Sequence, residues 1–305
     1  MVLVNGAVFN DKEFHNGEVI FEKPEAIIDK SLNTIEMFFK DNRDITAVLF
    51  AREYLADKAP DAKCNLVMKY CPYERMDRAI GNQLFSMYYF AEILYKFDFD
   101  KIYILDPHSE VCRDLLITDK HHIQIIDLEQ YVREVIRDFN PDYICYPDKG
   151  AYSKYPKVLS HIDIPYFYGQ KTRDLANNGK IVDYELVNAP DLTDKKVLII
   201  DDICCLGGTA YNAALKMKDA GAKEVAFYIS HCEDGIFVGN ILKPETLYEH
   251  KKEVADTIDL DGNKTGEQRT VELEIPVGTR QIIDKVYTAN TMLLSNTHEK
   301  IVIIE

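Results

Sequence analysis

Two adjacent carboxylates and a glycine-rich turn form the segment best suited to chemistry. Asp201 and Asp202 follow the apolar residues 197–200, and residues 207–209 read Gly-Gly-Thr before a helical pattern. The backbone N–H groups of such a turn can bind phosphate at the positive end of a helix. The carboxylates can accept hydrogen bonds from ribose hydroxyls, directly or through metal-bound water. An ordinary strand–turn–helix with an acidic cap has the same outline, but the combination predicts a site for a phosphorylated ribose.

Charged residues also follow four other predicted strands. Segments 72–78, 106–108, 147–150 and 169–173 each come after an apolar run and contain Arg, His, Asp or Lys. Ligands of open parallel sheets bind outside the carboxyl ends of the strands. Any one of these segments could be a solvated loop. Together with residues 201–202 they make five such segments, which predict a polar site along one edge of a sheet.

Short apolar strands that alternate with helical patterns are expected to position these residues. Most predicted strands are continuous apolar runs, which is typical of parallel strands buried on both faces. Their ranges are 65–70, 101–105, 122–126, 142–146, 164–168, 196–200, 224–230, 285–288 and 301–304. Helices are predicted over residues 82–97, with a wide, buried apolar surface, and over residues 209–220, ending at Gly221.

This alternation predicts an α/β fold with two subdomains built on parallel sheets. A chain of 305 residues is long enough for two domains, which we expect to span residues 1–138 and 139–305. Residues 244–282 break the alternation with a polar stretch and a possible strand. We interpret them as an inserted arm or hairpin in the second subdomain.

The charge balance narrows the class of partner. The net charge is −15 and the pI is near 5.0. Binding to nucleic acid or to an anionic membrane surface needs clustered Lys and Arg, so both are disfavoured. Phosphorylated substrates would require Mg²⁺ and a few well-placed cations to overcome the acidic field.

Cysteine usage and the N-terminal residues predict a cytoplasmic protein. The seven cysteines are an odd number, include no Cys-x-x-Cys pair and lie mostly in apolar runs. This pattern is typical of reduced core thiols rather than of a zinc site or a disulfide framework. Residues 1–6 do not resemble a signal peptide. No segment approaches the roughly 18 apolar residues needed to span a bilayer.

Residues 201–209 resemble the phosphoribosyl-diphosphate (PRPP) binding motif of type I phosphoribosyltransferases and of ribose-phosphate diphosphokinases, the PRPP synthetases. Two further segments favour the diphosphokinases. Phe14-His15-Asn16-Gly17-Glu18 is similar to the Phe-x-Asp/Asn-x-Glu element that reaches the ATP base in a neighbouring subunit. Residues 72–78, which read Pro-Tyr-Glu-Arg-Met-Asp-Arg, resemble the Pro-Tyr-x-Arg-x-Asp segment that binds ATP.

Three more segments match the diphosphokinases in the same order along the chain. Asp106-Pro107-His108 resembles their Asp-x-His, whose histidine binds Mg²⁺, and residues 147–150 resemble their Pro-Asp-x-Gly, whose aspartate is the metal partner. Residues 171–173 resemble the mobile Lys-Arg-Arg loop that covers the reacting phosphates. The chain is identified as a divergent, short member of this family, which implies two Rossmann-like subdomains of the type I phosphoribosyltransferase kind.

The resemblance implies transfer of the β,γ-diphosphate of ATP to the anomeric O1 of a 5-phosphorylated ribose, with release of AMP, in a homo-oligomer (dimer or hexamer). Lys171 and Arg173 would be catalytic, and His108 and Asp148 would hold Mg²⁺. The implied ATP-binding residues are Phe14, Asn16, Glu18, Arg75 and Asp77. The implied ribose-phosphate-binding residues are Asp201, Asp202, Cys205, Leu206, Gly207, Gly208 and Thr209.

Departures from the family pattern concern the acceptor and the assembly. Cys205-Leu206 stands where the family usually has Asp-Thr, so a hydroxyl is lost from the pocket for the sugar 5-phosphate. The N-terminal segment is shorter than is usual in the family, and the insertion 244–282 is foreign to the family. The last helix of the family is missing. The acceptor is either ribose 5-phosphate or a larger ribose such as ADP-ribose, because a phosphodiester would need the lost hydroxyl less.

Two alternative functions explain the motifs less well than a diphosphokinase does, and one histidine is not assigned to the site. A salvage phosphoribosyltransferase would not need the segments at 14–18, 72–78 and 106–108. A non-catalytic regulatory homologue should have lost the Lys-x-Arg loop or the metal pair, and both are present. His231 follows the predicted strand 224–230 and is expected to be a satisfied loop residue rather than part of the site.

Overall fold

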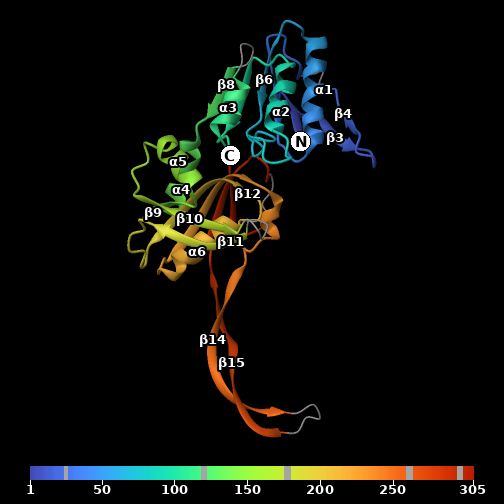
Figure 1. Cartoon of the computed structure of the whole chain (residues 1–305). Coiled ribbons are helices and arrows are strands. Elements are labelled where there is room, and N and C mark those ends of the chain that lie inside the picture. Colours follow the sequence, from blue (N-terminus) through green and yellow to red (C-terminus); the bar gives the residue numbers. More distant parts are fainter. Residues whose placement is uncertain (24–26, 118–121, 175–179, 259–263, 294–297) are drawn as a thin grey trace.

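Two mostly parallel sheets, each with helices packed on it, form two stacked halves of the molecule (Figure 1). The computed structural model describes residues 1–23, 27–117, 122–174, 180–258, 264–293 and 298–305. The predicted α/β class with two phosphoribosyltransferase-type units is confirmed. Among the described residues, none of the helices is long and apolar enough to cross a membrane.

The first sheet has the strand order β2-β1-β5-β6-β7-β8. Strands β5 to β8 are parallel, and β1 runs antiparallel to both of its neighbours. The strands are β1 (Val2–Val4), β2 (Ala7–Val8), β5 (Leu32–Met37), β6 (Lys63–Val67), β7 (Lys101–Leu105) and β8 (His122–Ile126). A separate hairpin, β3 (Asn10–Glu13) and β4 (Val19–Phe21), lies beside this half (Figure 1).

Helices α1 (Asn42–Lys58), α2 (Ser86–Tyr95) and α3 (Glu110–Leu116) belong to the first half. Helix α1 begins with a capping box between Asp41 and Asp44, which satisfies backbone N–H groups at its start. Its buried residues recur every three or four positions and pack against the sheet; they are Asp44, Ala47, Val48, Ala51 and Leu55.

The second sheet has the order β11-β10-β9-β12-β13-β16-β17, and among its described strands only β11 runs antiparallel to its neighbour. The strands are β9 (Tyr143–Tyr146), β10 (Tyr166–Asp174), β11 (Lys180–Val187), β12 (Lys196–Cys204), β13 (Glu224–Cys232), β16 (Lys285–Ala289) and β17 (Ile301–Ile304). Helices α4 (Leu128–Phe139), α5 (Lys149–Val158) and α6 (Gly208–Asp219) cover it. Strand β13 is buried along almost its whole length, as expected for a parallel strand covered on both faces.

Helix α4 belongs to the second half by its packing. Its apolar side chains share a core with β12 and β13, in which Val132 and Val135 lie with Leu198 and Tyr228. The division near residue 139 stays a prediction. These core contacts support a boundary before α4, at about residue 127.

Residues predicted to be an inserted arm or hairpin form β14 (Pro244–Ile258) and β15 (Lys264–Gln281). The two strands pair antiparallel and extend away from the second half as a long arm (Figure 1).

Helix α2 differs from its prediction. It begins at Ser86 and packs one face on the core, whereas Tyr88, Tyr89 and Ile93 on its other face are exposed. The prediction of a well-buried helix was wrong, because only one side of α2 has a sheet to pack against.

Candidate active site

The carboxyl ends of β7 and β12 meet where the two halves join. His108, just after β7, is joined to Asp202 of β12 by a hydrogen bond of 2.7 Å between Nδ1 and Oδ2. This bond with the carboxylate raises the pKa of His108. The structure therefore brings together two predicted site residues that lie 94 positions apart in the sequence.

The adjacent acids Asp201 and Asp202 have opposite electrostatic environments. Burial, together with the carboxylates of Asp202 and Asp148, raises the pKa of Asp201 well above its usual range. Burial also opposes ionisation of Asp202, but the hydrogen bond from His108 and the charge of Lys154 outweigh it and lower its pKa to about 2. The surroundings therefore favour ionisation of Asp202 and oppose that of Asp201.

Lys171 and Asp148 form an ion pair on the second half, with Nζ and Oδ2 2.5 Å apart. Asp148 caps α5 by accepting a hydrogen bond from the Ala151 N–H. Lys171 was predicted to lie in a mobile loop, but it belongs to β10 and pairs with Tyr184 of β11. The side chain of Arg173 and residues 175–179 lie outside the part of the chain that the structure describes.

The turn between β12 and α6 surrounds a hollow of about 180 Å³. Gly207 has a φ of +75°, a left-handed conformation that favours glycine, and α6 begins at Gly208. Gly239 packs against this turn. A Cβ added at Gly239 would lie 2.1 Å from the Leu206 carbonyl oxygen, so only glycine allows the two backbone segments to approach so closely. The hollow thus brings backbone N–H groups at a helix start together with Thr209, an arrangement suited to a phosphate.

Two residues predicted to bind ATP lie near this region. Arg75 comes from the first half but lines the hollow of the glycine-rich turn, where its guanidinium group is 3.0 Å from Glu233 Oε1. Asp77 is buried and paired with Arg78. Arg75 is therefore positioned beside the predicted sugar-phosphate turn.

The remaining predicted ATP residues lie on the β3–β4 hairpin. Asn16 and Glu18 hydrogen-bond to each other through Nδ2 and Oε2, and the Phe14 ring is 56% exposed. The hairpin lies at the outer side of the first half (Figure 1). Within one chain the structure does not bring Phe14, Asn16 and Glu18 to the His108–Asp202 site.

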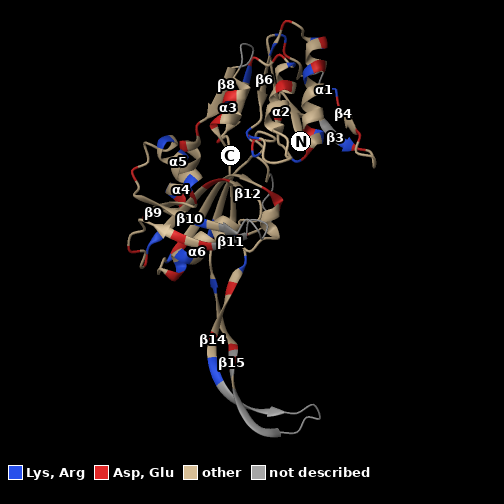
Figure 2. Ribbon diagram, viewed as in Figure 1, with Lys and Arg blue, Asp and Glu red and all other residues tan. Residues whose placement is uncertain are grey.

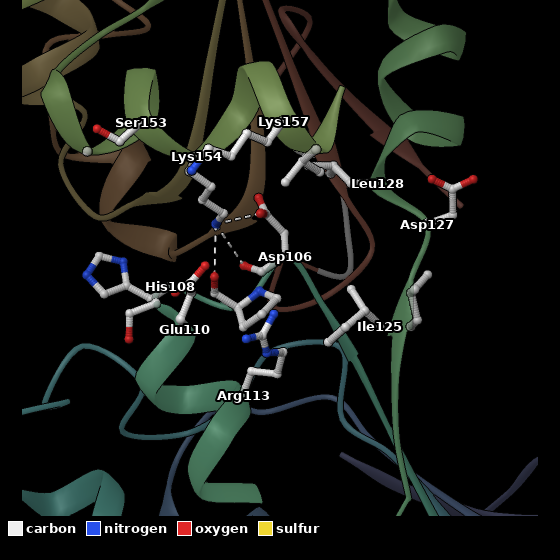
Figure 3. Close-up of a pocket in the computed structure, with 15 residues that line it drawn as sticks. Asp106, His108, Glu110, Arg113, Ile125, Asp127, Leu128, Ser153, Lys154 and Lys157 are labelled. Atoms are coloured by element: carbon white, nitrogen blue, oxygen red, sulfur yellow. Dashed lines mark hydrogen bonds and ion pairs between the residues drawn. The ribbon is translucent and has the colours of Figure 1, made fainter. Parts of the chain in front are cut away.

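A second, larger cavity of about 690 Å³ opens beside His108, between β8, α3 and α5 (Figure 3). Arg113, Lys154 and Lys157 contribute cationic groups to it, and Ile125 and Leu128 contribute apolar walls. Along the rest of the ribbon, acidic and basic residues are interspersed over both halves (Figure 2).

The predicted Mg²⁺ ligands do not pair with each other, since His108 contacts Asp202 while Asp148 contacts Lys171. Among the described residues, no three His, Cys, Asp or Glu side chains are grouped so as to hold a metal ion. Mg²⁺ usually binds through one or two carboxylates, with waters and substrate phosphates completing its shell. The carboxylates of Asp202 and Asp148 fit that mode, and His108 contacts the first of them.

Several contacts at this junction were not predicted from the sequence. The buried Asp106 carboxylate forms an ion pair with Lys154 and accepts hydrogen bonds from the hydroxyl groups of Tyr155 and Ser230. All three residues belong to the second half. The buried Glu74 accepts a hydrogen bond from the His108 backbone N–H at 3.2 Å. Neither Lys154 nor Ser230 belongs to a motif, so only their position at a helix face and a strand end could have indicated a role.

His231 and the cysteines agree with what was predicted of them. His231 is fully buried and hydrogen-bonds with Leu105 and Thr291, and burial lowers its pKa to about 4. It is a satisfied structural residue, although it lies at a strand end rather than in a loop. All seven cysteines carry free thiols, and six of them are buried.

Comparisons with known proteins give matches over much of the chain. Residues 118–268 match the family model described as the phosphoribosyl transferase domain. The ribose-phosphate pyrophosphokinase of Sulfurisphaera tokodaii is 25% identical over 234 residues, covering 75% of this chain and 77% of the relative. That of Pyrococcus abyssi is 25% identical over 263 residues, covering 83% and 85%. That of Methanobrevibacter smithii is 28% identical over 225 residues, covering 70% and 74%.

A solved structure has the same fold over nearly the whole chain. The crystal structure of phosphoribosylpyrophosphate synthetase from Mycobacterium smegmatis superposes with a TM-score of 0.68 at 17% identity. The match covers 98% of this chain and 86% of that chain. Both halves therefore have the arrangement found in that structure.

Proposed function

Because the chain is a divergent member of the ribose-phosphate pyrophosphokinase family, and thus a transferase, we propose that it moves the β,γ-diphosphate of ATP to the anomeric O1 of a 5-phosphorylated ribose and releases AMP. The observation that carries the proposal is the meeting of the two halves at His108 and Asp202. His108, which is predicted to bind Mg²⁺, contacts Asp202, one of the two acids predicted to orient the ribose.

The second half supplies the groups proposed to bind the ribose and to stabilise the transferred charge. Asp201 and Asp202 bind the ribose hydroxyls through hydrogen bonds. The N–H groups of the glycine-rich turn bind the 5-phosphate. Lys171, beside this pair, stabilises the charge that develops on the transferred diphosphate. Such chemistry consists largely of positioning and charge neutralisation.

We propose Mg²⁺ as the cofactor, held by Asp202 and Asp148 with His108 beside them. When bound, it would neutralise charge on the ATP phosphates. Without it, the acidic surroundings of Asp148, Asp201 and Asp202 would repel the nucleotide. The test of the proposed function is incubation with ATP, Mg²⁺ and a ribose phosphate, for which we expect AMP as the nucleotide product.

A second acceptor, ADP-ribose, is favoured by one observation. The Leu206 side chain is 54% exposed at the turn predicted to bind the 5-phosphate, where the family usually has a hydroxyl. Arg75 of the first half lines the same hollow, so a phosphodiester bound there would still have a cationic side chain beside it. A terminal phosphate dianion gains more from each donor around it than a diester does, because charge-assisted hydrogen bonds are the stronger kind.

We predict that ADP-ribose competes with, or replaces, ribose 5-phosphate as acceptor. The measurement is kcat/KM for each acceptor at equal ATP, in the wild type and in Leu206→Thr. Restoring the hydroxyl should raise kcat/KM for ribose 5-phosphate several-fold and leave that for ADP-ribose nearly unchanged. A wild-type preference of tenfold or more for ribose 5-phosphate, about 1.4 kcal/mol in transition-state binding, would end the ADP-ribose idea.

We also propose that the enzyme acts in the cytoplasm as a homo-oligomer. The exposed apolar surface formed by Ile80, Leu84 and the outer face of α2 supports an interface with a second copy. The exposed Phe14 hairpin would then complete a neighbour's ATP site. Light scattering after size-exclusion chromatography at micromolar concentration should give a dimer or larger. A fully active monomer would contradict this and leave the hairpin to act within its own chain.

A further inference from the structure

Asp106 is a buried charged group at the junction of the two halves. It directly follows β7 on the first half and is 2% exposed. Its carboxylate Oδ2 accepts hydrogen bonds from Tyr155 at 2.8 Å and Ser230 at 2.5 Å, both from the second half. The residue has a φ of +45°, a conformation that costs free energy for a side chain other than glycine. Such a backbone persists only where its surroundings hold it.

Lys154 on α5 also contacts this turn (Figure 3). Its Nζ lies 2.6 Å from Asp106 Oδ1 and donates a hydrogen bond of 2.9 Å to the Pro107 carbonyl oxygen. The same Nζ lies 3.8 Å from Asp202 Oδ2. One ammonium group therefore contacts the turn that precedes His108 and the carboxylate that His108 binds.

The turn is held from its other side by Glu74, which accepts the His108 backbone N–H. His108 is thus attached to the first half through its backbone and to the second half through its ring. The Lys154 ammonium group lies within reach of the carboxylates of both Asp106 and Asp202 and can pair with each of them.

We propose that Lys154 is a positioning residue that joins the two halves of the site: by binding Asp106, Pro107 and Asp202 together, it fixes His108 against Asp202. The kinetic part of this inference rests on the proposed diphosphoryl transfer. Lys154 does not touch a reacting atom, so its effect on the reaction passes through His108 and Asp202.

A purely structural role for Lys154 predicts different results. Removing one partner of a buried ion pair is destabilising in itself, so a lower melting temperature alone would not distinguish the two roles. A structural defect reduces the amount of folded enzyme, and the remaining molecules keep the wild-type KM and Mg²⁺ dependence. A positioning defect changes folded molecules, lowering kcat and raising the Mg²⁺ concentration for half-maximal rate.

The experiment compares the wild type with Lys154→Met, Lys154→Arg and Lys157→Met. Lys157 lies one turn further along α5 and lines the same cavity, so it controls for loss of a lysine there. For Lys154→Met we expect kcat to fall by about 30-fold or more and the half-maximal Mg²⁺ concentration to rise several-fold. Lys154→Arg should recover most of the activity because it keeps a cation, and Lys157→Met should match the wild type.

Hydrogen exchange gives a readout that does not depend on turnover. In Lys154→Met, amides of the peptide covering residues 105–110 should exchange about tenfold faster or more, whereas Lys157→Met leaves them unchanged. If Lys154→Met does not fold, Asp106→Asn removes the same ion pair and should give the same two signatures. Wild-type exchange and kinetics in whichever of the two variants folds would overturn the role of Lys154. A wild-type chain that forms no AMP would instead contradict the proposed function, and the exchange result would still decide whether Lys154 holds the turn.

Discussion

Replacing Lys171 by alanine is expected to lower kcat by about 10²-fold or more while KM for ATP and for the acceptor changes little. Lys171 pairs with Asp148 at the edge of the proposed site, and a cation placed there stabilises charge that develops only as the diphosphate is transferred. Loss of an interaction made only in the transition state lowers kcat and kcat/KM equally. A 10²-fold loss corresponds to about 2.7 kcal/mol.

Lys149 provides the matched control for this variant. It neighbours Asp148 in the sequence and is exposed at the start of α5. Lys149→Ala should therefore keep kcat and KM within about twofold of the wild type, as is usual for an exposed side chain without a special contact. If Lys171→Ala raises KM and leaves kcat intact, Lys171 is a substrate anchor and not a transition-state residue.

Replacing His108 by alanine is the second change with a large expected effect. His108 contacts Asp202 at the junction and follows the turn that Glu74 and Lys154 hold. Its loss should raise the Mg²⁺ concentration for half-maximal rate by about tenfold or more, or abolish turnover, because metal-site partners typically contribute 10–100-fold to metal affinity or activity. Excess chelator should stop the wild-type reaction.

His161 is the control for the His108 variant, since it is 81% exposed and pairs with Glu129 on the surface. His161→Ala should show the wild-type Mg²⁺ dependence. The same Mg²⁺ dependence in His108→Ala would remove His108 from the metal site. Turnover that persists undiminished in excess chelator would end the requirement for a divalent cation.

Strands made of continuous apolar runs were predictable from the sequence. Residues 101–105, 122–126 and 301–304 agree with β7, β8 and β17 residue for residue, because short runs rich in Ile and Val favour strands. The N-terminal strands were not assigned. β1 has three residues, and β5 alternates buried with partly exposed positions and includes the polar residues Asn33 and Glu36, so neither is a continuous apolar run.

Contacts between the halves could not be predicted in the same way. The motifs predicted His108 and Asp202 as site residues, but not that they bind each other, because their contact depends on how the two sheets stack. Lys154 and Ser230 belong to no motif and acquire a role only through the buried Asp106 carboxylate. β10 continues to Asp174 because β11 pairs with it, which places Lys171 on a strand where local sequence predicted a loop.

The nucleotide product of ATP in the presence of a ribose acceptor tests the central claim most directly. The wild-type chain is incubated with ATP, Mg²⁺ and either ribose 5-phosphate or ADP-ribose, and the products are followed by ³¹P NMR. Diphosphoryl transfer predicts AMP and a sugar with a diphosphate on its anomeric carbon, formed in equal amounts and only when the acceptor is present. ADP with a singly phosphorylated sugar, or AMP released without any acceptor, would contradict the account.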